Sequence, residues 1–549
     1  MLFNGVDERG SIQIVRFCSI ARFFYSFWRY EMNSIIRGCQ LGGVVFSILF
    51  LSFSGTAIVE AGGPWEHITK LDAEDGAHSD EFGRSVALWG NRAVIGAPDN
   101  DDNGTSSGSA YVFDISTGQQ LFKLLAKDAE LNDYFGTSVA LSGNLTVVGA
   151  NKGGGITTNT GAAYVFDVTT GEQLYKLFAT DGKAHDNFGV SVSLSGHLAV
   201  IGSSNGDGKS ASTGTSYVFD ITTGELLVKL SAVDGNAYDV FGKSVAISGN
   251  TALIGAPFDG DNGRFSGSAY IFDVSTGQQL FKLQPADGAL GDKFGSSVSL
   301  SGHLAVIGAP FDDDNDFSSG SVYVFDATTG QQLFKLHAAD FLAYSIFGFS
   351  VSISNDLIVV GEYGDNDKGG FSGSAYVFDA TTGEQLSKLV AADGDEDDWF
   401  GWSVANSGTQ VVIGALFDRT SHHNATGSGY VYQPGCLNLA VTNLVAGKNA
   451  IINITDGLPG TRSVTFYGTR LGNTIVNDFI GYCANLGIKG LSRNKLVGGI
   501  SRVFDMNGEI SFSQFVPDNA NGVHLFFQSA MQGTCPDECV SNLVDMVVQ

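Results

Sequence analysis

The sequence predicts an all-β protein, in which a closed seven-bladed β-propeller is followed by a small disulfide-bonded domain resembling a β-sandwich. The dipeptide Phe-Gly recurs seven times at a constant spacing of 53 residues, and each repeat contains four short segments of alternating apolar and polar residues. Glycine contributes 73 of the 549 residues, whereas charged residues are only 16%. Alternating segments between glycine-rich turns are typical of antiparallel strands, and four such strands per repeat are typical of propeller blades.

The composition argues against several classes of function. Acidic residues number 57 and basic residues 30, so the formal net charge is −27. Proteins that bind nucleic acid contact its phosphates with lysine and arginine, which are scarce in this chain. Abundant glycine together with few charged residues also disfavours a helical bundle. We therefore expect no nucleic-acid partner.

Residues 1–61 are interpreted as a mispredicted start followed by a signal peptide. Residues 41–53 form an apolar run that fits the core of a signal peptide and is too short to span a bilayer as a helix. Small residues ending at Ala57 and Ala61 offer cleavage sites, and Met32 is the expected true start. An uncleaved membrane anchor is the alternative. We expect a secreted or cell-surface protein, extracellular or periplasmic, with no transmembrane span in the mature chain.

The propeller is expected to cover residues 62–433, and each repeat has four strand segments, a to d. In the first unit these segments cover residues 83–88, 92–96, 109–113 and 119–125. A tight Ser-Gly-Asn or Ser-Gly-His turn joins most a and b segments. An Asp-x-Ser/Thr-Thr-Gly turn joins c and d, because aspartate can bond its own following backbone and glycine tolerates positive φ. The seven Phe-Gly motifs begin at Phe82, Phe135, Phe188, Phe241, Phe294, Phe347 and Phe400.

The two ends of the repeat array complement each other. The seventh unit stops after residues 430–432 and lacks a d segment, whereas a d-like segment, residues 67–71, precedes the first Phe-Gly. If this N-terminal segment becomes the outer strand of the last blade, the ring closes and avoids the exposed edge of an open array. The sequence therefore predicts a closed propeller.

Three repeats continue into Gly-Ala-Pro, at residues 96–98, 255–257 and 308–310. Phe-Gly followed by Gly-Ala-Pro in a β-strand repeat resembles the FG-GAP family, the repeat of integrin α-subunit propellers and of many bacterial secreted proteins. The resemblance covers about residues 66–433 and implies a propeller used for extracellular adhesion or ligand binding. One feature departs from the family. Integrin-type repeats often place an Asp-x-Asp-x-Asp-Gly calcium loop between the two motifs, where this chain has a short turn, so that calcium site is not carried over.

Strands alternate in direction, so the b–c and d–a connections are expected to emerge on one face of the ring. Acidic residues gather in both kinds of connection, and several b–c connections place oxygen ligands at alternate positions. Calcium takes roughly six to eight oxygen ligands in flexible geometry, so these loops are predicted to bind calcium. The alternative is a set of solvated acidic turns that keep the protein soluble. The predicted ligands are Asp99, Asp101, Asn103, Asp259, Asp261, Asp312, Asp314, Asp316, Asp365 and Asp367.

The sequence contains no Gly-x-Ser-x-Gly, His-Glu-x-x-His or phosphate-binding glycine loop, and we expect no enzymatic activity. We predict a binding or adhesion protein whose propeller face meets an extracellular protein or glycan. The alternatives are a glycan-binding lectin and a polysaccharide-acting enzyme on the acidic face. A remote alternative is a PQQ-type quinoprotein, whose repeats the c–d half also resembles. The usual tryptophan region of that repeat is occupied here by Phe122, Tyr175, Val228, Phe281, Phe334 and Ser387.

From residue 436 the 53-residue period is lost, and residues 436–549 are expected to form the second domain. Segments such as 437–441, 450–455 and 463–467 are predicted strands. Export favours two disulfides with three possible pairings, and a zinc site is the competing interpretation. The domain is expected to serve attachment or partner binding, or to cap the propeller. Its cysteines are Cys436, Cys483, Cys535 and Cys539.

Overall fold

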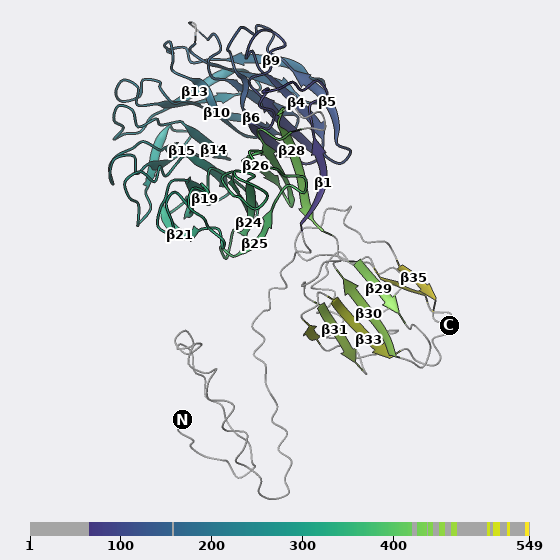
Figure 1. The fold of residues 1–549 in the computed structure, drawn as a ribbon. Helices are drawn as coiled ribbons and strands as arrows, with labels where there is room; N and C mark the ends of the chain where they lie inside the picture. The colour runs from purple at the N-terminus through teal and green to yellow at the C-terminus, as the bar shows by residue number, and fades with distance from the viewer. Residues whose placement is uncertain are drawn as a thin grey trace, which may run out of the picture. The chain divides into compact units, whose positions relative to one another are not determined.

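The computed structural model describes residues 65–435, except 156, 158 and 420–424, and the backbone of seven strands between residues 438 and 547 (Figure 1). The predicted signal peptide and the four C-terminal cysteines lie outside the described residues. Among the residues that are described, no helix is long and apolar enough to cross a membrane.

Residues 65–434 form seven antiparallel sheets of four strands, and each sheet is one blade with the strand order a-b-c-d. The a strands are β2 (Ser85–Trp89), β6 (Phe135–Ser142), β10 (Phe188–Ser195), β14 (Ser244–Ser248), β18 (Ser297–Ser301), β22 (Ser350–Ser354) and β26 (Phe400–Ser407). The b strands are β3 (Arg92–Ala97), β7 (Leu145–Ala150), β11 (Leu198–Ser203), β15 (Thr251–Ala256), β19 (Leu304–Ala309), β23 (Leu357–Glu362) and β27 (Gln410–Ala415).

The c strands carry the Tyr-Val-Phe pattern, and the d strands end in Lys-Leu. The c strands are β4 (Ser109–Asp114), β8 (Ala162–Asp167), β12 (Thr215–Asp220), β16 (Ser268–Asp273), β20 (Ser321–Asp326), β24 (Ser374–Asp379) and β28 (Ser428–Pro434). The d strands are β5 (Gln119–Leu124), β9 (Glu172–Leu177), β13 (Glu225–Leu230), β17 (Gln278–Leu283), β21 (Gln331–Leu336), β25 (Gln385–Leu389) and β1 (Trp65–Leu71).

The N-terminal strand closes the ring. The a strands of successive blades contact one another, and β26 of the seventh blade contacts β2 of the first. The seventh blade takes its outer strand from the other end of the propeller, because β1 pairs antiparallel with β28, with Lys70 opposite Tyr430 and Leu71 opposite Gly429. Figure 1 shows these two strands side by side. The predicted closed seven-bladed propeller is therefore confirmed.

The phenylalanine of each Phe-Gly motif packs between two blades. Phe135 is completely buried, and its ring lies 5.5 Å from that of Tyr164 and 5.8 Å from that of Phe166, both in its own blade. Phe135 shares a core cluster with Val94 and Val112 of the preceding blade. Burial of apolar area and edge-to-face aromatic pairs both stabilise such contacts. The motif therefore holds neighbouring blades together.

The glycine near the end of each b strand lets two blades approach closely. A Cβ at Gly255 of β15 would lie 2.1 Å from the carbonyl oxygen of Gly295 in the next blade. Ser244 Oγ donates a 2.8 Å hydrogen bond to the same carbonyl. The equivalent bond occurs between every pair of neighbouring blades, and the one from Ser403 to Gly83 joins the last blade to the first. The repeated glycine is therefore required by backbone contact between blades.

Beyond the propeller, the described backbone forms two further sheets. One has the strand order β29-β30-β33-β31-β32, in which β31 and β33 are parallel, and the other pairs β34 with β35. Their bounds are β29 (Asn438–Thr442), β30 (Asn449–Thr455), β31 (Ser463–Gly468), β32 (Arg502–Asp505), β33 (Glu509–Phe515), β34 (His524–Phe527) and β35 (Val544–Val547). Strands occur at the predicted segments, while the sandwich arrangement and the disulfides stay predictions.

Candidate functional site

The d–a and b–c loops lie together on one face of the propeller, which we call the loop face. Phe135 N at the end of a d–a loop donates a 3.1 Å hydrogen bond to Ser107 O of the preceding blade's b–c loop, and the equivalent residues are bonded in the other blades. The loop face comprises the described residues of the d–a loops 72–81, 125–134, 178–187, 231–240, 284–293, 337–346 and 390–399, and of the b–c loops 98–108, 151–161, 204–214, 257–267, 310–320, 363–373 and 416–427. The a–b and c–d turns form the opposite face, called the turn face.

On the loop face, a lysine at the end of each d strand pairs with an aspartate of the d–a loop leading into its blade. In the fifth blade Lys335 Nζ lies 2.9 Å from Asp287 Oδ2, and Tyr323 Oη donates to Asp287 Oδ1 at 3.0 Å. Lys335 also lies 3.1 Å from Asp312 and 2.5 Å from Asp314 of its own b–c loop. The ammonium therefore joins two loops to the outer strand. The seven pairs are Lys123–Asp75, Lys176–Asp128, Lys229–Asp181, Lys282–Asp234, Lys335–Asp287, Lys388–Asp340 and Lys70–Asp393.

These ion pairs keep both partners charged. Burial alone would lower the pKa of Lys335, but the bonds to Asp314 and Asp287 outweigh burial and raise that pKa above its usual value. Burial alone would raise the pKa of Asp287, but the bond from Lys335 lowers it below its usual value. The acidic residues do gather on the loop face as the sequence predicts. The lysines among them turn part of that face into an array of ion pairs.

Six of the ten predicted calcium ligands contact these lysines, and four do not. In the first blade Asn100 Oδ1 accepts the backbone N–H of Asp102, as Asp259 Oδ1 accepts that of Asp261 in the fourth blade. Because Asn100 and Asp102 occupy the equivalent positions, the predicted alternation in this loop is one residue out of register with the structural repeat. The ligands beside a lysine are Asp259, Asp261, Asp312, Asp314, Asp365 and Asp367. The other four are Asp99, Asp101, Asn103 and Asp316.

A second aspartate of each d–a loop is buried and stabilises its own loop, except in the sixth blade. Asp292 Oδ2, for example, accepts the backbone N–H of Ala289 at 2.6 Å. Burial and nearby carboxylates raise the pKa of Asp292 to about 6, although the bond from Ala289 opposes this. In the sixth blade this position is Ser345, and Glu362 stands where most blades have alanine at the end of strand b. In the sixth blade Glu362, at the end of strand b, therefore provides the buried carboxyl group that the d–a loop lacks.

Glu362 is an unusually placed acid. Its side chain is buried, Oε2 accepts a 2.7 Å hydrogen bond from Tyr376 Oη, and Oε1 has no hydrogen-bond partner among the described residues. Burial raises the pKa of Glu362 to about 8, while the Tyr376 bond opposes this rise and Asp365 adds to it. A carboxyl group with a raised pKa binds its proton more tightly in the folded protein than in the unfolded chain. Its contribution to stability is complete below the unfolded pKa and is lost as the pH rises towards 8.

We therefore expect Glu362→Gln to remove part of the pH dependence of stability. Between pH 6 and pH 8, the wild-type free energy of unfolding should fall more steeply than that of the variant, because only in the wild type does unfolding release the proton that the buried Glu362 carboxyl group holds. Urea titrations across this range measure both slopes. Glu172→Gln, at the exposed start of β9, is the control and should keep the wild-type slope. If the free energy of unfolding changed equally with pH in Glu362→Gln and in the wild type, the raised pKa assigned to Glu362 would be contradicted.

Five aromatic side chains from the sixth and seventh blades gather where the loops of the loop face meet the inner a strands. Trp399 and Trp402 are stacked, with ring centroids 5.3 Å apart and planes inclined by 23°. Phe349 lies 4.5 Å from Trp402, Tyr363 lies 5.3 Å from Trp399, and Phe417 lies 4.7 Å from Trp399. All five are partly exposed. We call Phe349, Tyr363, Trp399, Trp402 and Phe417 the aromatic cluster.

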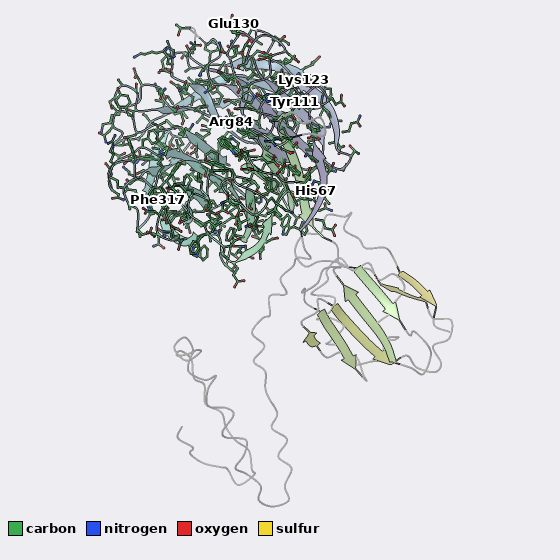
Figure 2. The ribbon with its side chains drawn as sticks, viewed as in Figure 1. His67, Arg84, Tyr111, Lys123, Glu130 and Phe317 are labelled. Carbon is green, nitrogen blue, oxygen red and sulfur yellow. The ribbon has the colours of Figure 1, made fainter. Side chains whose placement is uncertain are left out.

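Two cations, Arg84 and Lys243, occupy the position after Phe-Gly in their blades, which is the position of Trp402 in the seventh blade. The Arg84 guanidinium lies 5.1 Å from the Trp402 ring centroid, and Arg84 Nη1 lies 2.8 Å from Glu81 Oε2. Solvent reaches the Lys243 side chain, yet the surrounding protein lowers the pKa of Lys243, and the positive charge of Arg84 lowers it further. Lys243 and Arg84 belong to the fourth and first blades, which are not neighbours, so this interaction crosses the ring. Figure 2 shows Arg84 towards the middle of the propeller and Lys123 nearer its edge.

The fold is a β-propeller built from seven copies of one repeat, an architecture that is consistent with a binding or adhesion-type protein. The FG-GAP repeat model matches the chain at residues 65–113, 119–166, 172–219, 225–272, 278–325, 331–378 and 384–432, and the chain belongs to this family. A comparison with curated proteins found no significant match.

The lysine–tyrosine–aspartate groups and the aromatic cluster were not predicted from the sequence. A signal for the first was available, because a lysine, a tyrosine and an aspartate recur at one phase in all seven repeats. The partners lie 48 residues apart in the chain for six of the pairs, in what look like unrelated strand and loop positions. The aromatic cluster has no signal in every repeat, since an aromatic residue follows Phe-Gly only in the sixth and seventh units.

Proposed function

We propose that the protein acts outside the cell as a non-enzymatic binding or adhesion protein and that its loop face contacts the ligand. The FG-GAP propeller is consistent with a binding or adhesion type of protein. One observation supports use of the loop face. The turn face repeats nearly the same Ser-Gly-Asn/His and Asp-x-x-Thr-Gly turns around the ring, whereas the side chains near the ring centre on the loop face differ between blades. A ligand that binds in one copy needs a surface that is not repeated identically in every blade.

We further propose that the protein is exported and that it binds an extracellular partner. The apolar run at residues 41–53 and the extracellular use of FG-GAP repeats support secretion or cell-surface display. The expected partner is an extracellular protein or a glycan. The full chain should capture such a ligand from cell-surface material, while turnover of polysaccharides measured in parallel should stay at background. Capture that is lost through changes on the turn face alone, or measurable turnover, would overturn the proposal.

Calcium binding at the loop face is a further part of the proposal. Carboxylate oxygens of Asp340, Asp365 and Asp367 lie within 4.8 Å of one another, which suits a cation with several oxygen ligands. Lys388 Nζ lies within 2.8 Å of all three groups, so calcium would compete with this ammonium. We expect millimolar calcium to raise the melting temperature, and to raise it more in Lys388→Met. Equal melting curves with calcium and with a chelator, in both proteins, would contradict calcium binding.

A further inference from the structure

The aromatic cluster is not required by the propeller fold, and the other blades serve as an internal comparison. Trp402 and Phe349 occupy the position after Phe-Gly, where the remaining blades have Arg84, Thr137, Val190, Lys243 and Ser296. Trp399 precedes Phe-Gly, where the remaining blades have Glu81, Tyr134, Asn187, Val240, Lys293 and Ile346. Charged, polar and aliphatic residues therefore satisfy the blade geometry at both positions. A role other than blade packing is needed to explain two adjacent tryptophans in a chain that has five.

The two central cations add a second, independent feature. The protein carries a net charge of −27, and every d-strand lysine named above is paired with an aspartate. Lys243, in contrast, is exposed and has no carboxylate within salt-bridge distance among the described residues. Arg84 carries five N–H donors, of which the Glu81 contact involves the Nη1 end. Positive charge is thus available at the ring centre of an acidic protein.

We propose that the aromatic cluster, together with Arg84 and Lys243, binds an acidic saccharide. A pyranose ring would stack its C–H face on the exposed part of the aromatic cluster, and its carboxylate would pair with the two cations. Flat aromatic surfaces with a few polar groups are typical of small-ligand sites, and charge-assisted bonds from arginine to carboxylate are strong. This inference rests on the proposed binding function and specifies its ligand and site.

The surroundings favour a saccharide over an acidic peptide. The d–a loop beside Trp399 exposes Asp395, Glu396 and Asp397, whose carboxylates accept hydrogen bonds and repel further negative charge. Sugar hydroxyls can donate to such acceptors on several sides of the ring, while only one carboxylate has to reach the cations. An acidic peptide has far fewer side-chain donors to offer to these carboxylates. The arrangement therefore suits a ligand with many hydroxyl groups and one acid per ring.

The test uses the full chain with galacturonic acid oligomers and with the same oligomers after methyl esterification, which removes the charge. Calorimetry measures affinity, and tryptophan fluorescence reports on the environment of Trp399 and Trp402. We expect the acidic oligomers to bind, and the esters to bind at least about tenfold more weakly, since about 1.4 kcal/mol corresponds to a factor of ten. Trp402→Ala and Lys243→Gln should each weaken binding of the acid by a similar factor or more. Lys243→Gln changes an exposed residue, so it tests the site even where Trp402→Ala fails to fold.

Trp89→Ala is the matched control, because Trp89 is an exposed tryptophan of the turn face. It should leave saccharide binding unchanged. Equal affinity for acid and ester, or full affinity in Lys243→Gln, would overturn the inference. Absence of saccharide binding together with capture of a protein or acidic peptide would also overturn it while leaving the proposed binding function intact. Absence of any extracellular ligand would instead contradict the proposed function itself.

Discussion

Replacing Gly255 with alanine is expected to lower the free energy of unfolding by about 3 kcal/mol or more, the range of severe overpacking. The added methyl group would lie 2.1 Å from the Gly295 carbonyl oxygen and 2.3 Å from Ser244 Oγ. The serine side chain can rotate away, but the carbonyl belongs to the backbone of the next blade. Relief of the clash therefore requires the two blades to separate, which disturbs the packing of Phe294 between them.

Gly249→Ala in the same blade is the matched control. Gly249 lies in the a–b turn with φ of 57°, and no atom lies within 4 Å of an added Cβ. Its cost is the left-handed conformation alone, about 1 kcal/mol. Chemical denaturation of both variants measures the difference. Similar free energies of unfolding for the two variants would show that blade contact does not require glycine at position 255.

Removing a d-strand lysine is expected to have a large effect only where it leaves a buried aspartate without a cation. Lys282 lies 3.0 Å from Asp259, whose side chain is 2% exposed. Breaking a buried ion pair costs about 3–5 kcal/mol, and we expect about 2–4 kcal/mol for Lys282→Met because the lysine itself is 17% exposed. Methionine keeps the apolar stem, so lost packing contributes little.

Lys123→Met is the matched control for the ion pair. Its partners Asp75 and Asp102 are both 47% exposed, and the buried position of its b–c loop is the neutral Asn100. Exposed pairs contribute about 1 kcal/mol or less, so this variant should lose correspondingly little stability. Urea denaturation at neutral pH measures both losses. If Lys282→Met and Lys123→Met lost equal free energies of unfolding, the buried carboxylate would not determine the loss of stability.

Much of the propeller could be predicted because its repeated residues act within fixed distances along the chain. Phe135 marks the start of an a strand, and the missing d segment of the last blade predicts its replacement by β1. The C-terminal domain has no such period, so only individual strands could be placed there. Repetition thus predicts the scaffold, because each blade must make the same contacts with its neighbours.

The candidate site could not be predicted in the same way. Asp99 and Asp101 fit an alternating ligand pattern, yet the structural repeat places Asn100 and Asp102 at the equivalent positions. Loop sequences carry no strand register, so alternation alone does not identify which side chains converge. The aromatic cluster combines residues from two blades, and Arg84 joins it through closure of the ring. Such a site depends on tertiary contacts that the spacing of residues does not encode.

Ring closure is tested most directly by a disulfide between the first and last strands of the propeller. Glu66 of β1 lies opposite Gln433 of β28. In Glu66→Cys/Gln433→Cys, oxidation should form a disulfide between the two introduced cysteines. Peptide mapping by mass spectrometry would distinguish this disulfide from any formed by the natural cysteines. Glu66→Cys/Gln385→Cys, with the second cysteine in the sixth blade, should form no such link. A closed propeller predicts the 66–433 disulfide in the folded protein. Its absence from folded, oxidised protein would contradict closure by β1 and the contact between Arg84 and the aromatic cluster that depends on it.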